Sequence, residues 1–173
     1  MSQDHQQYED DSFEQEPATN EKKHALKLSI DFLAVKDMKV SASISVAYGL
    51  RLVQVAQHQF KSQPPTPVNS NQSAETKLQG AFASYEFQAS KGEILALFSD
   101  NRLNARVQAQ GQEIGAATVE LKELLTAPLK KTPQAAVRVS DQYLPIKDAS
   151  GATKGLIRCI LYLQDLGEIA GAQ

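Results

Sequence analysis

The sequence predicts an all-β fold, an antiparallel β-sandwich of seven or eight strands with one or two short helical turns. Short segments recur in which apolar and polar residues alternate, and clusters of glycine, proline, asparagine, aspartate and serine separate them. Alternation with a period of two is typical of strands that bury one face. Many short strands with turn residues between them favour a sandwich, and a small barrel is the alternative.

Eight segments are predicted as strands. They lie at residues 26–33, 40–48, 52–55, 78–87, 103–109, 114–121, 135–146 and 156–163. The side chains change parity around Ala83–Ser84, which predicts a β-bulge in the fourth segment. The prolines of Gln63–Pro67 predict a break in strand pairing, followed by a long loop from Val68 to Thr76. Pro145 is expected to end the seventh strand, and Asp148–Gly151 supplies the turn before the eighth.

Two short helical turns are expected between strands. Ser90 precedes Glu93–Phe98, and a serine at a helix N-cap accepts a hydrogen bond from the N–H groups of the first turn. Lys122–Leu125 follows the sixth strand directly and is predicted to form a second helical turn. Helical segments this short leave the fold class all-β.

The closing strand, Leu156–Leu163, is apolar on both faces apart from Arg158. It is too short to span a bilayer, so a buried strand is expected. Alternation assigns Ile157, Cys159, Leu161 and Leu163 to the interior, and Leu156, Arg158, Ile160 and Tyr162 to the outer face. An apolar outer face predicts a cover: the tail, a neighbouring loop or a partner. If exposed in a monomer, Ile160 and Tyr162 are the first candidates for a binding surface.

The chain is predicted to have three parts. Residues 1–23 are rich in Gln, Asp and Glu and poor in aliphatic residues, so a disordered acidic tail is expected. The sandwich is expected to span residues 24–167, with a short C-terminal tail at 168–173. Six of the 20 acidic residues lie in residues 1–20, which contain no Lys or Arg, leaving 14 acids against 18 bases. This mild excess of basic residues in the rest of the chain permits an acidic partner without requiring one.

The sequence contains no evident catalytic, cofactor-binding or metal-binding set. His5, His24 and His58 lack the i, i+4 spacing of a helical zinc site, and no Gly-x-Ser-x-Gly motif presents a nucleophile. Cys159 lies among aliphatic residues and fits core packing in a reducing compartment, as in the cytoplasm. Gly111–Gly115 lacks the Lys-Ser/Thr ending of a phosphate loop. Nucleic-acid binding is not expected either, because aromatic residues do not interleave with a basic cluster.

Three segments carry a resemblance to the C2 domain family. Leu26–Phe32 resembles the opening strand of that family, Glu113–Leu125 its Ile-Gly-x-x-x-Val-x-Leu segment with a small helix, and Gly155–Gly167 its closing strand. The resemblance covers roughly residues 24–167. It implies an eight-stranded antiparallel sandwich that acts as a non-catalytic interaction module.

The calcium ligands of many C2 domains have no clear counterpart in this sequence. Calcium takes six to eight oxygen ligands, so several carboxylates must converge. The loop after the first strand offers only Asp37, and the stretch after the predicted helix offers Asp100 and Asn101. Calcium-dependent lipid binding is therefore not expected. A calcium-independent basic face for anionic phospholipid is the alternative function, and its candidate residues are Lys61, Lys77, Arg51 and Arg106.

Within the C2 family, the chain is most similar to modules of centriolar and ciliary proteins, a class that includes the hundred-and-twenty-kilodalton centrosomal protein. The similar features are the opening Ser-Ile-Asp, the Tyr85–Phe87 segment and the closing Gln164–Gly167. This resemblance implies a scaffold in centriole or cilium assembly that binds tubulin, microtubules or other centrosomal proteins. It implies a cytoplasmic location at the centrosome, centriole or cilium base. The candidate interaction surface comprises Arg158, Ile160, Tyr162, Arg106 and Lys77.

Overall fold

The structure is a computed structural model that describes residues 22–52, 55–131 and 136–169. Within them lie eleven strands: β1 (His24–Lys36), β2 (Ala42–Leu52), β3 (Val55–Lys61), β4 (Thr66–Val68), β5 (Thr76–Lys77), β6 (Phe82–Ala89), β7 (Arg102–Ala109), β8 (Gln112–Glu120), β9 (Leu129–Lys131), β10 (Ala136–Lys147) and β11 (Thr153–Glu168). Eight of these strands have seven residues or more, in agreement with the prediction. The predicted acidic tail lies almost entirely outside the described residues.

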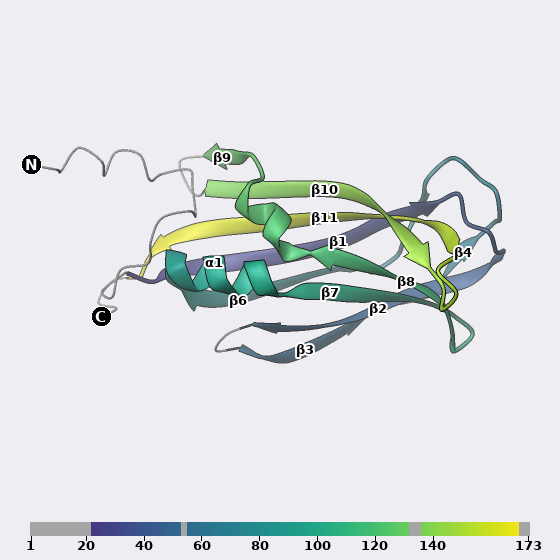
Figure 1. Cartoon of the computed structure of the whole chain (residues 1–173), viewed down its shortest axis with the longest axis horizontal. Coiled ribbons are helices and arrows are strands. Elements are labelled where there is room, and N and C mark those ends of the chain that lie inside the picture. Colours follow the sequence, from purple (N-terminus) through teal and green to yellow (C-terminus); the bar gives the residue numbers. More distant parts are fainter. Residues whose placement is uncertain (1–21, 53–54, 132–135, 170–173) are drawn as a thin grey trace, which may run out of the picture.

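The strands form one antiparallel sheet that curls into two layers (Figure 1). The first layer contains β6, β1, β11 and β10, with β5 and β9 at its margins, and the second contains β3, β2, β7 and β8, with β4 beside β2. The two layers are continuous through a single pairing of Lys147 on β10 with Ala116 on β8. This arrangement is an antiparallel β-sandwich, as predicted.

The core lies between the layers, and the alternation of side chains places residues there. The four residues of β11 predicted to face the interior are at most 3% exposed: Ile157, Cys159, Leu161 and Leu163. From β1, Leu26, Leu28, Ile30 and Phe32 contribute. The second layer adds Ile44, Val46, Val107 and Val119. Each fully buried aliphatic side chain stabilises the fold by roughly 1.5–3 kcal/mol relative to exposure.

The helix α1 (Lys91–Asp100) begins where the sequence predicts. The Glu93 N–H donates to Ser90 Oγ over 3.2 Å, and the Ser90 N–H donates to Glu93 Oε1 over 2.9 Å, which forms a capping box. Ile94, Leu97 and Phe98 are buried, so the helix packs its apolar side against the core. The second predicted turn is the 3₁₀ helix η2 (Leu121–Leu125).

The predicted bulge at Ala83–Ser84 is wrong. The strand begins only at Phe82 and pairs with β1 in one continuous register to Ala89. The change of parity arises because Leu78 to Ala81 form a turn and not a strand. Gly80 has φ +60° in this turn, where a Cβ would lie 2.4 Å from the Gln63 carbonyl oxygen.

Three further expectations about strand ends need correction. Leu52 and Val55 do not form one short strand, since Leu52 closes β2 and pairs with Val55, the first residue of β3. Thr66–Val68 pairs with β2 despite Pro67, because a proline is tolerated on a strand at a sheet edge. Pro145 does not end β10, which continues to Lys147. Among the described pairs, β11 alone lies beside Pro145, so no ladder bond is lost on the other side.

Candidate interaction surfaces

The outward side of β6, β1, β11 and β10, here called the outer face, carries most of the residues predicted to interact. Cross-strand pairing builds one row across it, in which Phe82, Asp31, Ile160 and Asp141 come from four successive strands. Phe82 is 53% exposed at one end of the row. Ile160, in the middle, is only 9% exposed. The row therefore presents an aromatic ring to solvent beside a half-buried carboxylate.

The next row explains how Ile160 and Tyr162 are covered. Tyr162 is half-buried between Ser29 on β1 and Val139 on β10. Ser29 is itself buried, and its hydroxyl lies 2.9 Å from that of Ser84 on β6. Adjacent strands of the same sheet therefore shield these side chains in part, so neither Ile160 nor Tyr162 is fully exposed.

Arg158 is engaged within the chain. Its guanidinium donates to both carboxylate oxygens of Asp141, over 2.9 and 2.7 Å, and lies 3.3 Å from Glu75 in the β4–β5 loop. The hydrogen bond from Arg158 lowers the pKa of Asp141. The Tyr143 hydroxyl donates a hydrogen bond to the Glu75 carboxylate, and the Lys36 ammonium lies 4.2 Å from the centre of the Tyr143 ring. This cluster fastens the β4–β5 loop to β10 and β11.

Two charged side chains lie near the edge of the outer face. Lys77 is exposed on β5, where it pairs with Ala34 of β1. Asp31 is half-buried, and burial raises the pKa of its carboxyl group while Lys77 acts to lower it. No hydrogen bond or ion pair of the Asp31 side chain is found among the described residues.

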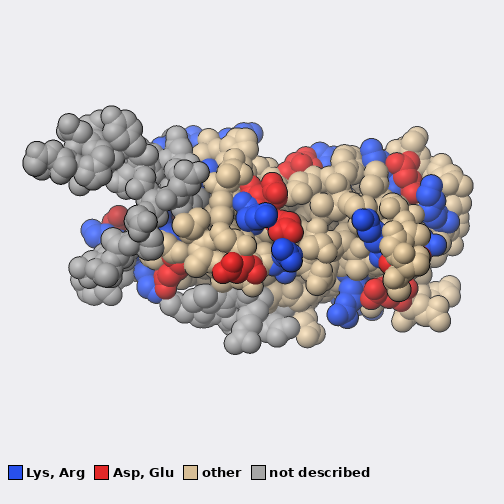
Figure 2. Space-filling view, viewed as in Figure 1, with Lys and Arg blue, Asp and Glu red and all other residues tan. Residues whose placement is uncertain are grey.

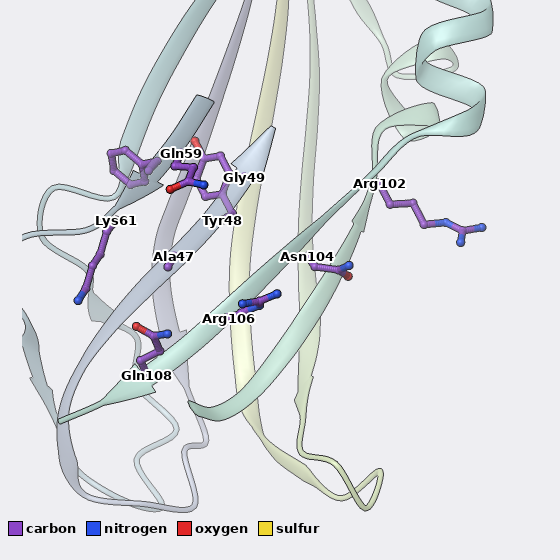
Figure 3. Close-up of a pocket in the computed structure, with 10 residues that line it drawn as sticks. Ala47, Tyr48, Gly49, Gln59, Lys61, Arg102, Asn104, Arg106 and Gln108 are labelled. Carbon is purple, nitrogen blue, oxygen red and sulfur yellow. The ribbon is translucent and has the colours of Figure 1, made fainter. Parts of the chain in front are cut away.

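Acidic and basic side chains intermingle over the face shown in Figure 2. Three cations lie together on the second layer, around a cavity of about 540 Å³ (Figure 3). Its lining residues are Ala47, Tyr48, Gly49, Gln59, Phe60, Lys61, Arg102, Asn104, Arg106 and Gln108. These residues come from β2, β3 and β7 and include three cations and no carboxylate. We call this hollow the basic cavity.

The basic cavity results from short side chains in the central strand. Ala47 of β2 pairs with Lys61 of β3 on one side and with Arg106 of β7 on the other. The two long cationic side chains therefore flank a residue with a single methyl group, and Figure 3 shows them on opposite sides of Ala47. Gly49 extends the shallow floor beside Gln59.

Two cations of the basic cavity have acidic neighbours on β8. Arg102 lies 3.0 Å from Glu120, and Arg106 lies 3.9 Å from Glu113. Both arginine side chains are more than 60% exposed, so these ion pairs are screened by water and contribute little to stability. They restrain the guanidinium groups without burying them.

The structure brings together only part of the predicted basic face. Lys61 and Arg106 share the basic cavity, whereas Lys77 lies on the other layer, and the side chain of Arg51 lies outside the described residues. Sequence reasoning missed Arg102 and Asn104, although both have the same parity as Arg106 along β7. The polar residues at alternate positions of β7 were the signal that could have identified them.

No group of three or more His, Cys, Asp or Glu side chains is placed to hold a metal ion in residues 22–52, 55–131 and 136–169. Cys159 is buried, and burial raises the pKa of its thiol well above the ordinary value. A thiol in that state is a poor nucleophile. Within the described part of the chain, the helices are all too short or too polar to cross a membrane.

Comparison with solved structures identifies the fold. A structure that comprises two C2 domains of Extended-Synaptotagmin 2 matches 90% of this chain with a TM-score of 0.50 and 12% sequence identity. The match covers 45% of that chain, so this chain spans less than half of its length. No family model and no curated protein matches the sequence. The fold is therefore a C2-like β-sandwich, as predicted, while the resemblance to centriolar modules stays a prediction.

Proposed function

We propose that this chain is a non-catalytic, calcium-independent C2-type interaction module that binds other proteins through the outer face. In this proposal it acts as a scaffold in centriole or cilium assembly, with tubulin or other centrosomal proteins as partners. Its place is the cytoplasm, at the centrosome, centriole or cilium base. The partner class and location rest on the sequence resemblance. Calcium independence rests on the few acidic residues in the loop sequences.

The observation that best supports protein binding is the exposed ring of Phe82. A phenylalanine that is half exposed on a sheet contributes nothing to the core, and aromatic side chains are enriched at protein interfaces. Tyr143, 42% exposed on the same face, gives a second aromatic contact. Ile160, which is 9% exposed, lies between them on the same face. Together these side chains resemble the centre of an interface more than a solvated sheet.

The test is binding of the full chain to soluble tubulin in a pull-down and to microtubules by co-sedimentation, each with calcium and with a chelator. We expect binding that is equal in both conditions and at least tenfold weaker in the Phe82→Ser variant. Leu166→Ser is the matched control, because Leu166 is 44% exposed near the end of β11 and away from the row of Phe82. Failure to bind either form of tubulin, with no centriolar location of a tagged chain, would sink the proposal.

The basic cavity favours a second candidate function, binding of anionic phospholipid without calcium. Lys61 and Arg106 flank the small Ala47, so a phosphate group could approach both cations at once. Each basic residue near an anionic bilayer contributes about 1 kcal/mol, which salt weakens. The double variant Lys61→Gln/Arg106→Gln should therefore reduce binding roughly 30-fold.

Liposome flotation distinguishes this candidate. Vesicles containing phosphatidylserine and a phosphoinositide should bind the chain at low salt and release it at high salt. Lys77→Gln removes one charge from the opposite layer and should leave flotation unchanged. Equal flotation of the double variant and the natural chain would rule out the basic cavity as the lipid site.

A further inference from the structure

The edge of the first layer is formed by β6, an eight-residue strand with regular geometry. It pairs with β1 from Phe82–Asp31 to Ala89–His24 without any shift of register. Within the part of the chain that the structure describes, no strand pairs with its other side. The side of a β-strand that faces away from its neighbour offers backbone N–H and C=O groups to a further strand.

Proteins usually protect such an edge, and β6 carries only one of the usual devices, the charged side chain of Glu86. Prolines, inward-pointing charges, lysines, bulges and very short edge strands all hinder strand addition. The sequence of β6 is Phe-Ala-Ser-Tyr-Glu-Phe-Gln-Ala, which contains no Pro, Gly, Lys or Arg. At the opposite margin of the sheet, β2 pairs with β3, which ends in Lys61, and with β4, which has three residues and contains Pro67. The edge of β6 is therefore suited to accept another strand.

The side chains beside this edge specify the chemistry of the added strand. Phe82, Ser84, Glu86 and Gln88 are the exposed residues of β6. Asp31 lies across from Phe82 on β1 and is half-buried. Lys77 attracts its carboxylate, but no hydrogen bond or ion pair of that side chain is found among the described residues. A Lys or Arg side chain opposite Phe82 could pack along the exposed ring and direct its cation to Asp31. A second basic residue four positions along would lie opposite Glu86, because residues of equal parity share one face.

We infer that the outer edge of β6 accepts an extended segment of a partner protein, which adds as a strand and places two basic side chains, four residues apart, over Phe82 and Glu86. This inference rests on the proposed function as a protein-binding module and names the chemistry of the partner. A second copy of the chain fits less well, because β6 itself carries no basic residue to place there. Main-chain hydrogen bonds supply affinity in such complexes, and alternate side chains supply specificity.

The experiment uses the full chain, labelled for amide hydrogen exchange by NMR, and capped nine-residue peptides as probes. The first peptide alternates valine and threonine and has arginine at two positions of equal parity, four residues apart. The matched peptide has glutamate at both positions. Two further versions of the arginine peptide are N-methylated at alternate residues, so that one or the other of its two edges loses its N–H groups.

We expect alternate amides of β6 to exchange rapidly in the unbound chain and at least tenfold more slowly with the arginine peptide. The glutamate peptide should give no protection. Methylation of one peptide edge should abolish binding, whereas methylation of the other should preserve it. The variants Phe82→Ser and Asp31→Asn should each weaken binding at least fivefold, and Leu166→Ser should not change it.

Several results would overturn the inference. These are equal binding of both methylated peptides, protection confined to strands other than β6, and no protection by the arginine peptide at millimolar concentration. Complete protection of β6 in the unbound chain would also overturn it, and the mass from light scattering would then show whether a second copy covers the edge. Binding of the arginine peptide without any binding of tubulin would support strand addition and remove tubulin as the proposed partner. Binding of tubulin without any binding of the arginine peptide would support tubulin as the partner and overturn strand addition at β6.

Discussion

His24 at the start of β1 and Asp165 near the end of β11 are joined by a 3.0 Å contact between Nδ1 and Oδ1. The Asp165 carboxylate also accepts the Gly167 N–H over 2.9 Å. Two neighbouring ion pairs, Lys22–Glu168 and Lys23–Glu93, lie at the same end of the sandwich. The two outermost ends of the described chain are thus held together by polar contacts, one of which can titrate near neutral pH.

This pair predicts a specific pH dependence of stability. The hydrogen bond to Asp165 raises the pKa of His24 above its ordinary 6.5, although burial opposes it. A raised pKa means that the stabilisation is complete below pH 6.5 and is lost as the pH rises through the folded-state value. Burial acts to raise the pKa of Asp165, but hydrogen bonds from His24 and Gly167 lower it overall. Its contribution is therefore lost only as the pH falls below its ordinary 3.8.

The measurement is the melting temperature of the natural chain and of His24→Gln between pH 5 and 8. Glutamine keeps a hydrogen-bond donor but cannot take up the charge. We expect the natural chain to exceed the variant most at pH 5 to 6, with the difference shrinking toward pH 8. A difference that grows with pH would contradict the assignment.

The buried side of the closing strand predicts a large effect of a single truncation. Leu161 is fully buried, so Leu161→Ala removes apolar contacts and leaves a cavity, at a cost of about 2–5 kcal/mol in the free energy of unfolding. Leu166→Ala, on the same strand but 44% exposed, should cost less than about 0.5 kcal/mol. Urea denaturation of both variants provides the comparison, and similar losses would contradict the assigned faces of β11.

The capping box of α1 predicts a smaller and local effect. Ser90→Ala removes the acceptor for the Glu93 N–H, and the expected loss is about 1 kcal/mol. Ser99→Ala is a suitable control, because Ser99 is exposed in the last turn of the same helix. Chemical denaturation measures both changes. Equal effects of the two substitutions would show that the cap contributes nothing.

These faces and this cap are local features, which explains why the sequence predicts them. Alternation along Leu156–Leu163 reports which side of a strand is buried whatever strand lies beside it. Ser90 and Glu93 interact within one helical turn, so their spacing identifies the cap. Neither inference requires knowledge of distant parts of the chain.

The candidate surfaces depend on pairings that no local pattern reveals. The basic cavity exists because Ala47 pairs with both Lys61 and Arg106, which are separated in the sequence by β4, β5, β6 and α1. The exposure of Phe82 depends on where β6 begins, which the turn at Gly80 determines. The alternation from Leu78, with its change of parity around Ala83–Ser84, predicts a longer, bulged strand instead. Long-range register therefore accounts for most of what sequence reasoning missed.

The turn before β6 predicts a contrast between two glycines. Gly80 and Gly111 both have positive φ, +60° and +82°, where a Cβ costs roughly 1–2 kcal/mol. A Cβ at Gly111 would meet nothing within 4 Å, whereas at Gly80 it would lie 2.4 Å from the Gln63 carbonyl oxygen. Gly111→Ala should therefore lower the free energy of unfolding by that conformational cost alone. Gly80→Ala should cost clearly more, because the backbone must move, and the start of β6 should shift with it. Denaturation of both variants measures the contrast, with NMR shifts of Phe82 as a local probe. Equal stabilities of the two variants would contradict the close approach of Gly80 to the Gln63 carbonyl oxygen.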